Sequence, residues 1–228
     1  MTEDADDLDA LIRRTDPDRW LSSRFVADPA ARADLMVIYA YDHELARAPR
    51  VASEPLMGEI RLTWWREALD EIFEKRTVRR QPTALALAEV VTRHGLPREP
   101  LEAMIDGRYR ELDRELMSPD EAVSWAASTA GETAAVAARL LDPVQDSGAV
   151  RAAGQAWALA RLERDGSGSQ LAGAVAQALR EARSAPVSPA AFPAVAHASL
   201  ARAYARGREL SELGKRLRLV LAVARGKV

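Results

Sequence analysis

The amino-acid sequence predicts an all-α fold. Residues that favour helices, mainly Ala, Leu, Arg and Glu, dominate the 228-residue chain, whereas the alternation of apolar and polar residues that is typical of strands is nearly absent. Proline repeatedly follows a polar residue that can cap a helix, which is the pattern of a first helical turn. We therefore expect a single helical domain over residues 1–228, with roughly nine to eleven helices.

Capping and proline signals divide the first fifty residues into helices. Residues 1–14 form an acidic N-terminal extension, within which residues 6–14 have the length of a short helix. Asp16-Pro17 and Asp28-Pro29 each place a capping carboxylate before a proline, so a helix is expected after each pair. Pro49 should end or kink the second of these helices, because it cannot donate the backbone hydrogen bond.

The next helix carries a tryptophan pair and is expected to begin at Ser53-Glu54-Pro55. Apolar residues recur along it every three to four positions, which predicts an amphipathic helix that packs on a core. For the Trp64-Trp65 pair, we expect core packing by one ring and partial exposure of the other. The apolar face predicted from this spacing consists of Met57, Ile60, Trp64, Ala68 and Ile72.

The second half of the chain shows the same punctuation. Gly95 follows one helix at the usual position of a left-handed terminator, and Ser118 with Glu121 forms a capping box before an Ala-rich helix that Gly131 interrupts. Residues 166–169, Gly-Ser-Gly-Ser, are expected to form a flexible linker. Further helices are expected over residues 82–94, 101–116, 118–141, 150–163, 170–183, 189–206 and 211–225.

Composition excludes several classes of protein. The 32 basic and 34 acidic side chains are mixed along the chain and leave a net charge of −2, so no basic surface for nucleic acid is expected. The absence of cysteine excludes disulfides and thiolate metal sites. The acidic start does not resemble a secretory signal, and no apolar run is long enough to span a bilayer. A cytoplasmic location is expected, with any membrane contact peripheral and at the inner face.

Short segments along most of the chain form a recognisable pattern. They are Asp18-Arg19-Trp20-Leu21, Leu35 to Tyr41, Glu44-Leu45-Ala46-Arg47, Ser53-Glu54-Pro55, Gly58 to Leu62, Trp64 to Leu69, Ile105-Asp106-Gly107, Ala130-Gly131, Gly154-Gln155-Ala156 and Arg218 to Val223. By these residues, most of the sequence resembles the squalene/phytoene synthase family, and most closely its branch related to the mitochondrial complex I assembly factor. The resemblance implies an isoprenoid-synthase fold, which is a helical bundle around a deep central cavity.

The first acidic motif of that family looks degenerate in this chain. Active members condense two prenyl diphosphates head to head, and two DxxxD motifs hold the magnesium ions that neutralise the diphosphate. By the resemblance, the acids of the first motif would fall at Ala46 and Arg50, with Arg47 where a further Asp is common. Tyr41 and Glu44 are the neighbouring candidates for lining the cavity. Arginines at these positions would repel Mg²⁺ or hold an anion directly.

The second motif looks degenerate as well. By the resemblance it follows Gly154-x-Ala156 and involves Trp157, Arg161 and Asp165, but the residue four positions after Asp165 is Ser169, within the expected linker. A single carboxylate cannot hold the metal cluster in the manner of the family. We therefore expect no metal, no cofactor and no catalytic residue; the alternative is a motif register displaced by one helical turn, in which case Mg²⁺ would be required.

Other polar residues near the first motif allow two interpretations. Asp42 and Glu44 are two residues apart and diverge by about 200° around a helix, so they cannot replace the lost pair. His43 suggests a metal ligand or general base, but a lone helical histidine is more often a surface or hydrogen-bonded residue. Arg47 and Arg50 could bind phosphate or pair with Glu44 and Glu54.

The C-terminal segment, residues 215–227, is a basic helix with an apolar side. Such a helix can dock on anionic lipid headgroups, or its apolar side can close the bundle, and the two roles are compatible.

Three hypotheses about function follow. In the first, the protein is a pseudoenzyme that holds a prenyl or other apolar ligand, or serves as an accessory factor for a membrane respiratory complex. In the second, it is an active head-to-head prenyl transferase of isoprenoid biosynthesis with a displaced or partner-supplied metal site, which convergence of Asp42, Glu44 and Asp165 in one cavity would favour. In the third, it is a structural interaction module, which a solid interior would indicate.

Overall fold

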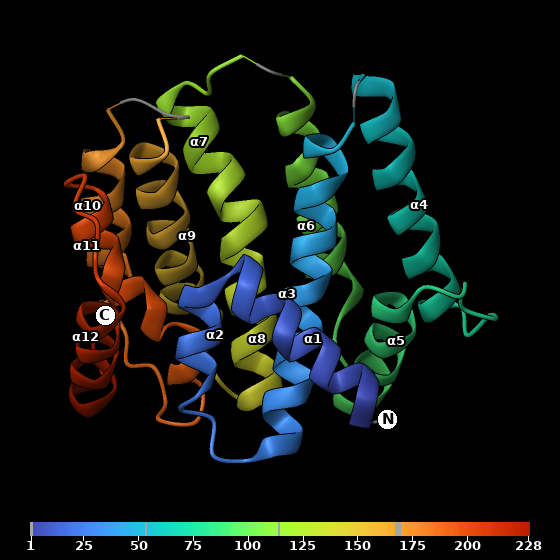
Figure 1. Cartoon of the computed structure of the whole chain (residues 1–228), viewed down its shortest axis with the longest axis horizontal. Helices are drawn as coiled ribbons and strands as arrows, with labels where there is room; N and C mark the ends of the chain where they lie inside the picture. Colours follow the sequence, from blue (N-terminus) through green and yellow to red (C-terminus); the bar gives the residue numbers. More distant parts are fainter. Residues whose placement is uncertain (1, 53, 114, 167–169) are drawn as a thin grey trace.

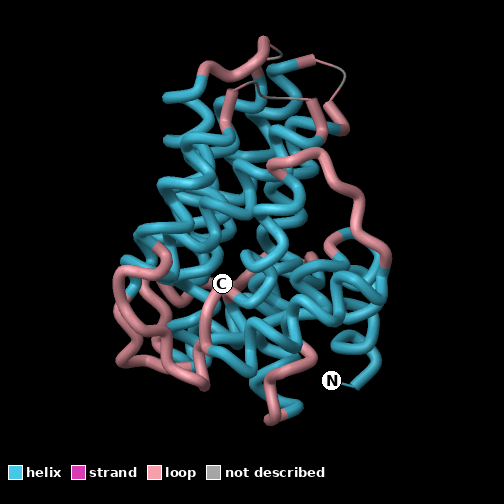
Figure 2. Tube along the Cα trace, turned by 90° about the vertical axis from the view of Figure 1, so that its left-hand side faces the viewer, coloured by secondary structure: helices cyan, strands magenta, loops and turns pink. Residues whose placement is uncertain are grey.

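The computed structural model describes residues 2–52, 54–113, 115–166 and 170–228, and within these ranges it contains helices and loops but no β-strand (Figures 1 and 2). The predicted all-α class is confirmed. The longer helices stand side by side in Figure 1, with α1 and α2 crossing in front of them. The α-helices are α1 (Thr2–Thr15), α2 (Pro17–Ser23), α3 (Pro29–Arg50), α4 (Pro55–Phe73), α5 (Pro82–His94), α6 (Arg98–Arg108), α7 (Pro119–Ala126), α8 (Glu132–Leu141), α9 (Ser147–Arg164), α10 (Ala172–Glu181), α11 (Ala201–Tyr204) and α12 (Glu212–Arg225).

Capping side chains start several helices where the sequence predicts them. The carboxylate of Asp16 accepts a hydrogen bond from the backbone N–H of Arg19, and that of Asp28 accepts one from Ala30. Ser118 and Glu121 form the reciprocal capping box at the start of α7. These contacts satisfy backbone donors that the first turn of a helix leaves free, so the starts of these helices follow from local sequence alone.

Helix α3 lies at the centre of the core and packs against α1, α4, α5 and α8. Its side chains Leu35, Ile38 and Leu45 are completely buried. The acidic segment at the N-terminus also contributes to this core, because Leu8 and Ile12 of α1 are buried in it. Asp7, Arg13 and Arg14 of α1 are exposed, while the apolar side of the helix covers α3.

Helix α4 buries only part of the predicted face. Ala68 and Ile72 are buried as predicted, but Met57 and Ile60 are exposed. Leu62, Trp65 and Leu69 complete the buried face in their place. Helix α4 lies at the edge of the bundle (Figure 1) and is apolar on more than one side. The spacing of its apolar residues is therefore compatible with two rotations of the helix about its axis. Only packing against neighbouring helices selects one of them. The tryptophan pair behaves as predicted, because Trp65 is buried and Trp64 is half-buried.

Five residues of π-helix, Ala127–Gly131, interrupt the Ala-rich segment between α7 and α8. This turn lies against α9 at Gly154, where a Cβ atom would come within 2.3 Å of the carbonyl oxygen of Ala130. Glycine is therefore required at position 154 for α9 to approach so closely.

Two predicted helices are shorter than the sequence suggests. Residues 189–206 form the 3₁₀ turns Phe192–Ala194 and Ala196–Leu200 before the single helical turn of α11, because Pro193 cannot donate a helical hydrogen bond. The helix expected over residues 101–116 ends in the 3₁₀ turn Tyr109–Leu112. Ser53 and residues 167–169 of the expected linker lie outside the described residues. Across the part of the chain that the structure describes, no helix combines the length and apolar character needed to cross a bilayer.

Candidate functional site

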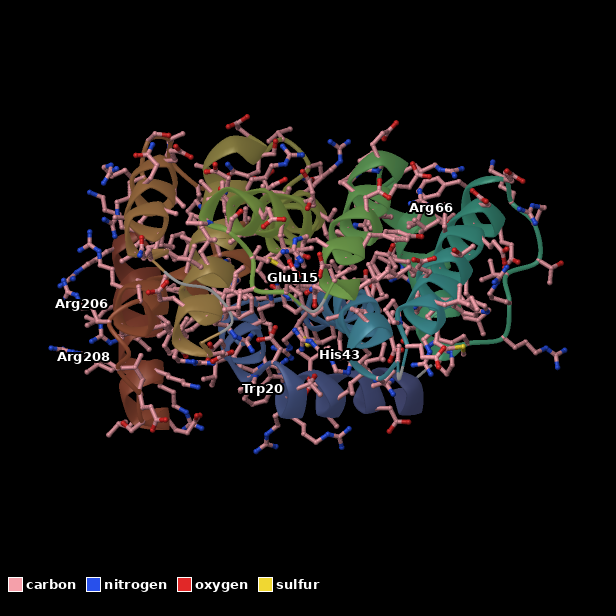
Figure 3. All side chains as sticks on the ribbon, turned by 90° about the horizontal axis from the view of Figure 1, so that it is seen from above. Trp20, His43, Arg66, Glu115, Arg206 and Arg208 are labelled. Atoms are coloured by element: carbon pink, nitrogen blue, oxygen red, sulfur yellow. The ribbon has the colours of Figure 1, made fainter. Side chains whose placement is uncertain are left out.

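A cavity of about 490 Å³ opens at the end of the bundle that is uppermost in Figure 1. Figure 3 looks onto this end and shows Glu115 and His43 near its middle. Its walls come from the end of α1, from α2, α3, α6 and α7, from the π-helical residues after α7, from α9 and from the segment that follows α6. The lining side chains include Asp16, Arg19, Tyr39, Asp42, His43, Ala46, Arg50, Arg108, Glu111, Asp113, Glu115, Leu116, Met117, Trp125, Thr129, Trp157, Arg161, Leu162 and Asp165.

Buried charges form a connected network at the base of the cavity. The two carboxylate oxygens of Asp42 each accept a hydrogen bond from an arginine, one from Arg19 at 2.5 Å and the other from Arg108 at 2.5 Å. Arg108 also donates to Glu111 at 2.6 Å, and Arg19 lies 3.4 Å from Asp16. Opposite charges therefore alternate through the network, so each buried charge has a partner.

This network keeps Asp42 ionised. Burial alone would raise the pKa of Asp42, but the positive charges of Arg108 and Arg19 outweigh it and hold the pKa well below its usual range. Asp42 and Glu111 likewise outweigh the effect of burial on Arg108 and raise its pKa. Because both oxygens of Asp42 already accept from guanidinium groups, this carboxylate is not free to coordinate a cation.

Aromatic rings form the wall next to the network. The guanidinium carbon of Arg19 lies 4.5 Å from the centre of the Trp157 ring, and that of Arg161 lies 4.6 Å from it. Tyr39 is buried, and its hydroxyl has no hydrogen-bond partner among the described residues. Burial raises the pKa of Tyr39, so the hydroxyl stays protonated and can donate to a ligand or to water.

Helical rotation decides which predicted residues of α3 reach the cavity. Ala46 and Arg50 line it, together with Tyr39, Asp42 and His43, because these positions recur every three to four residues. Tyr41 and Glu44 lie on the opposite side of α3.

The structure places three predicted cavity residues elsewhere. Tyr41 is buried, donates from its hydroxyl to the carbonyl of Leu101 at 3.0 Å and packs edge-on against Trp65. Glu44 and Arg47 form an exposed pair at 3.0 Å outside the cavity. The predicted pairing of Arg47 with Glu44 is therefore confirmed. Arg50 does not pair with Glu54; its nearest acid is Glu111, at 3.8 Å.

All three residues considered for the second motif line the cavity from the side of α9. Trp157 and Arg161 lie one turn apart on α9, and Asp165 follows at its C-terminal end. Asp165 is exposed and pairs with Arg164 at 2.8 Å. Ser169, the remaining position of the motif, lies outside the described residues.

Sequence reasoning missed the partners of Asp42. Arg108 follows Leu101, Met104 and Ile105 at helical spacing, so it lies on the buried face of α6. A cation on a buried face indicates a buried ion pair, and this pattern is visible in the sequence. Arg19 gave no comparable signal.

His43 lines the cavity; burial lowers its pKa, with Glu44 opposing that effect. Among the described residues, no three His, Asp or Glu side chains are grouped closely enough to hold a metal ion.

Comparisons with known proteins give the family and the fold. The model of a family described as squalene/phytoene synthase matches residues 12–167. A crystal structure of a dehydrosqualene synthase in complex with ligand superposes with a TM-score of 0.80 over 98% of this chain and 96% of that chain, at 13% sequence identity. That likeness confirms the predicted isoprenoid-synthase fold.

Curated relatives match a shorter part of the chain. NADH dehydrogenase (ubiquinone) complex I, assembly factor 6, is 32% identical in Bos taurus and 30% identical in Homo sapiens, in each case over 104 residues. The match covers 45% of this chain and 30% of each of those proteins. The chain thus aligns with less than a third of the length of these relatives.

Proposed function

The chain belongs to the squalene/phytoene synthase family, and from this membership we propose that it is a non-catalytic member that serves as an accessory factor for a membrane respiratory complex. In this proposal the protein has given up the magnesium-dependent ionisation of prenyl diphosphates. It retains the central cavity for a prenyl or other apolar ligand.

The residues that face each other across the cavity carry this proposal. Ala46 and Arg50 line it from α3, and Trp157, Arg161 and Asp165 line it from α9. The resemblance puts the carboxylates that hold magnesium at positions 46, 50, 165 and 169, and of these residues only Asp165 is an acid in this chain. Arg50 occupies one of the other positions, and Arg161 of α9 lies one turn before Asp165. The positive charges of Arg50 and Arg161 oppose binding of a divalent cation in this cavity. This arrangement supports the loss of the metal site.

The cavity itself supports ligand binding. Its volume of about 490 Å³ lies within the range of roughly 300–1,000 Å³ that is usual for pockets that bind small molecules. The rings of Tyr39, Trp125 and Trp157 offer apolar contact surface, and Arg50 and Arg161 offer positive charge. A prenyl chain with a polar or anionic end fits both properties.

Similarity to the assembly factor 6 proteins of cattle and human supports the accessory role. In the proposal, the client of this chain is a membrane complex of the NADH dehydrogenase type. The test is deletion of the gene in the source organism, followed by native-gel analysis of the assembled complex. We expect the amount of assembled NADH dehydrogenase to fall while an unrelated respiratory complex stays constant; an unchanged amount would contradict the accessory role.

An active prenyl transferase is the second candidate, because Asp42 and Asp165 do line one cavity. Two observations weaken it: Glu44 lies outside the cavity, and both oxygens of Asp42 accept from arginines. A structural module with a solid interior is disfavoured by the cavity.

Thermal unfolding with Mg²⁺ and farnesyl diphosphate separates these candidates, with a dehydrosqualene synthase as the positive control. Saturation at about 100 times Kd stabilises the native state by about 2.7 kcal/mol, which raises the Tm of a protein of this size by about 5–11 °C. We expect no rise that requires both metal and diphosphate, and no condensation product. A metal-dependent rise accompanied by product would establish the transferase instead.

A further inference from the structure

Helix α12 lies at the outer edge of the bundle (Figure 1, red) and buries only a narrow side. Leu219 and Ala222 pack on the core, and the ammonium group of Lys215 lies 3.0 Å from the carboxylate of Asp18, which is buried. These three contacts fix the rotation of α12 about its axis. They therefore also fix which of its residues point away from the protein.

The side of α12 opposite the core is apolar. Leu213 is 77% exposed and Leu217 is 58% exposed, and Val220 and Leu221 are exposed beside them. At about 100° per residue, these four positions fall within an arc of roughly 100° centred opposite the buried side. We call this set, Leu213, Leu217, Val220 and Leu221, the α12 stripe. Such a concentration of exposed aliphatic side chains on one helix marks an interaction surface.

Basic residues lie on both sides of the α12 stripe. Helical rotation places Arg216 on one flank and Arg218 with Arg225 on the other, and all three are exposed. Within the residues that the structure describes, none of the three has a carboxylate within 4.0 Å. Arg206 and Arg208, just before α12, point outward at the same edge (Figure 3).

Charge in this segment has one dominant sign. Residues 206–227 contain seven basic side chains and two acidic ones, Glu209 and Glu212, in a chain whose net charge is −2. The segment therefore carries a net charge of +5, whereas the rest of the chain carries −7. Its counterpart must be anionic on both flanks of the apolar stripe, which describes a continuous layer of lipid headgroups better than a single partner helix.

We propose that α12 is a docking surface for anionic membranes, on which the helix lies parallel to the bilayer plane. The α12 stripe enters the boundary between headgroups and acyl chains, while Arg216, Arg218 and Arg225 contact lipid phosphates. This inference does not depend on the function of the cavity. It identifies α12 as the side of the protein that faces the membrane. The mouth of the cavity lies at a different part of the surface.

Co-sedimentation of the full chain with vesicles tests this proposal. One set of vesicles contains phosphatidylcholine alone, and the other contains equal parts of phosphatidylcholine and phosphatidylglycerol. We expect binding to the mixed vesicles that weakens as salt is added, and little binding to phosphatidylcholine. Equal binding to both sets, or none to either, would overturn the proposal.

Paired variants locate the surface. Each basic residue close to an anionic bilayer strengthens binding about five-fold, so Arg216→Gln with Arg218→Gln should weaken it about twenty-five-fold. The matched control, Arg80→Gln with Arg139→Gln, removes the same charge from exposed positions on other helices or loops. We expect the control to bind nearly as well as the wild type, and equal losses in both variants would show that only net charge matters.

The apolar contribution needs its own variant. Leu217→Asp with Val220→Asp places two charges in the stripe and should abolish binding to vesicles, whereas Val144→Asp, at a position 90% exposed in the turn before α9, should leave it unchanged. Circular dichroism and Tm verify that each variant is folded.

A second copy of the chain is the competing occupant of the stripe. In that case, the wild type would sediment as a dimer without lipid and the variant with two aspartates as a monomer. That result would overturn the membrane proposal.

Discussion

The buried imidazole of His197 should make the protein less stable as the pH falls below about 6.5. The side chain is only 1% exposed, and neither ring nitrogen has a hydrogen-bond partner among the described residues. Its ring packs edge-on against Trp157, with 5.0 Å between centroids. Burial lowers the pKa of His197 well below its usual value, and the positive charges of Arg19 and Arg161 lower it further. The folded protein therefore holds this ring neutral.

The size of the effect follows from proton linkage. The unfolded chain protonates the histidine at its ordinary pKa of 6.5, whereas the folded chain does not, so the unfolded state binds more protons as the pH falls. This contribution to stability is complete above pH 6.5 and is lost below it. With the folded ring neutral throughout, the loss between pH 7 and pH 5 is about 2 kcal/mol, or about 4–8 °C in Tm.

Urea unfolding at the two pH values, followed by tryptophan fluorescence, measures this loss. In His197→Leu, the dependence of the unfolding free energy on pH should shrink by about 2 kcal/mol, because the variant has no group to protonate at this position. Groups that both proteins share cancel in the difference. At pH 7, the variant should be close to the wild type in stability, since it exchanges a buried unpartnered polar ring for an apolar side chain of similar size.

His43→Gln is the matched control. His43 is only half-buried, and Glu44 opposes the lowering of its pKa, so this variant should retain most of the pH dependence. Equal pH dependence in His197→Leu and the wild type would refute the reasoning, because it would mean that the folded state accepts the proton at position 197.

Two further substitutions test the packing and charge of the cavity. Asp42→Asn leaves two buried arginines without their shared carboxylate and should lower the free energy of unfolding by about 3–5 kcal/mol. Glu44→Gln, the control in an exposed pair, should change it by less than about 1 kcal/mol. Similar losses for both variants in urea unfolding would contradict the proposed role of the network. Gly154→Ala forces a Cβ atom to within 2.3 Å of a carbonyl oxygen and should lower Tm. The control Gly173→Ala, in α10 with open space around it, should leave Tm unchanged or raise it. An unchanged Tm in Gly154→Ala would show that α9 can move away from the π-helical residues.

Local chemistry explains which parts of the fold the sequence predicts. Asp16, Asp28 and Ser118 cap backbone groups within three residues of themselves, so no knowledge of distant contacts is needed. The same holds for the positions of Ala46 and Arg50 on one side of a helix. The buried face of α4 is different, because two rotations fit its apolar residues and only contacts with α3 and α6 select one.

The charge network could not be predicted for a related reason. Arg19 precedes Asp42 by 23 residues and Arg108 follows it by 66, so these pairs exist only after α2, α3 and α6 have packed together. From sequence spacing, Asp42 can be considered only as a possible metal ligand. It has no second carboxylate four residues later, so the spacing predicts no role for it. Its true partners are cations, and the apolar spacing of α6 before Arg108 was the available indication.

Under the proposed function, this network also explains how the cavity persists without catalysis. A carboxylate buried beside a cavity is costly unless a positive charge compensates it. Here Arg19 and Arg108 supply that charge from within the chain, with geometry set by α2 and α6. Putting carboxylates back at positions 46 and 50 would therefore not suffice to rebuild a metal site, because the arginines of the network and Arg161 would still surround it. Under the proposed function, substitutions in the motifs alone would leave these guanidinium groups of α2, α6 and α9 in place.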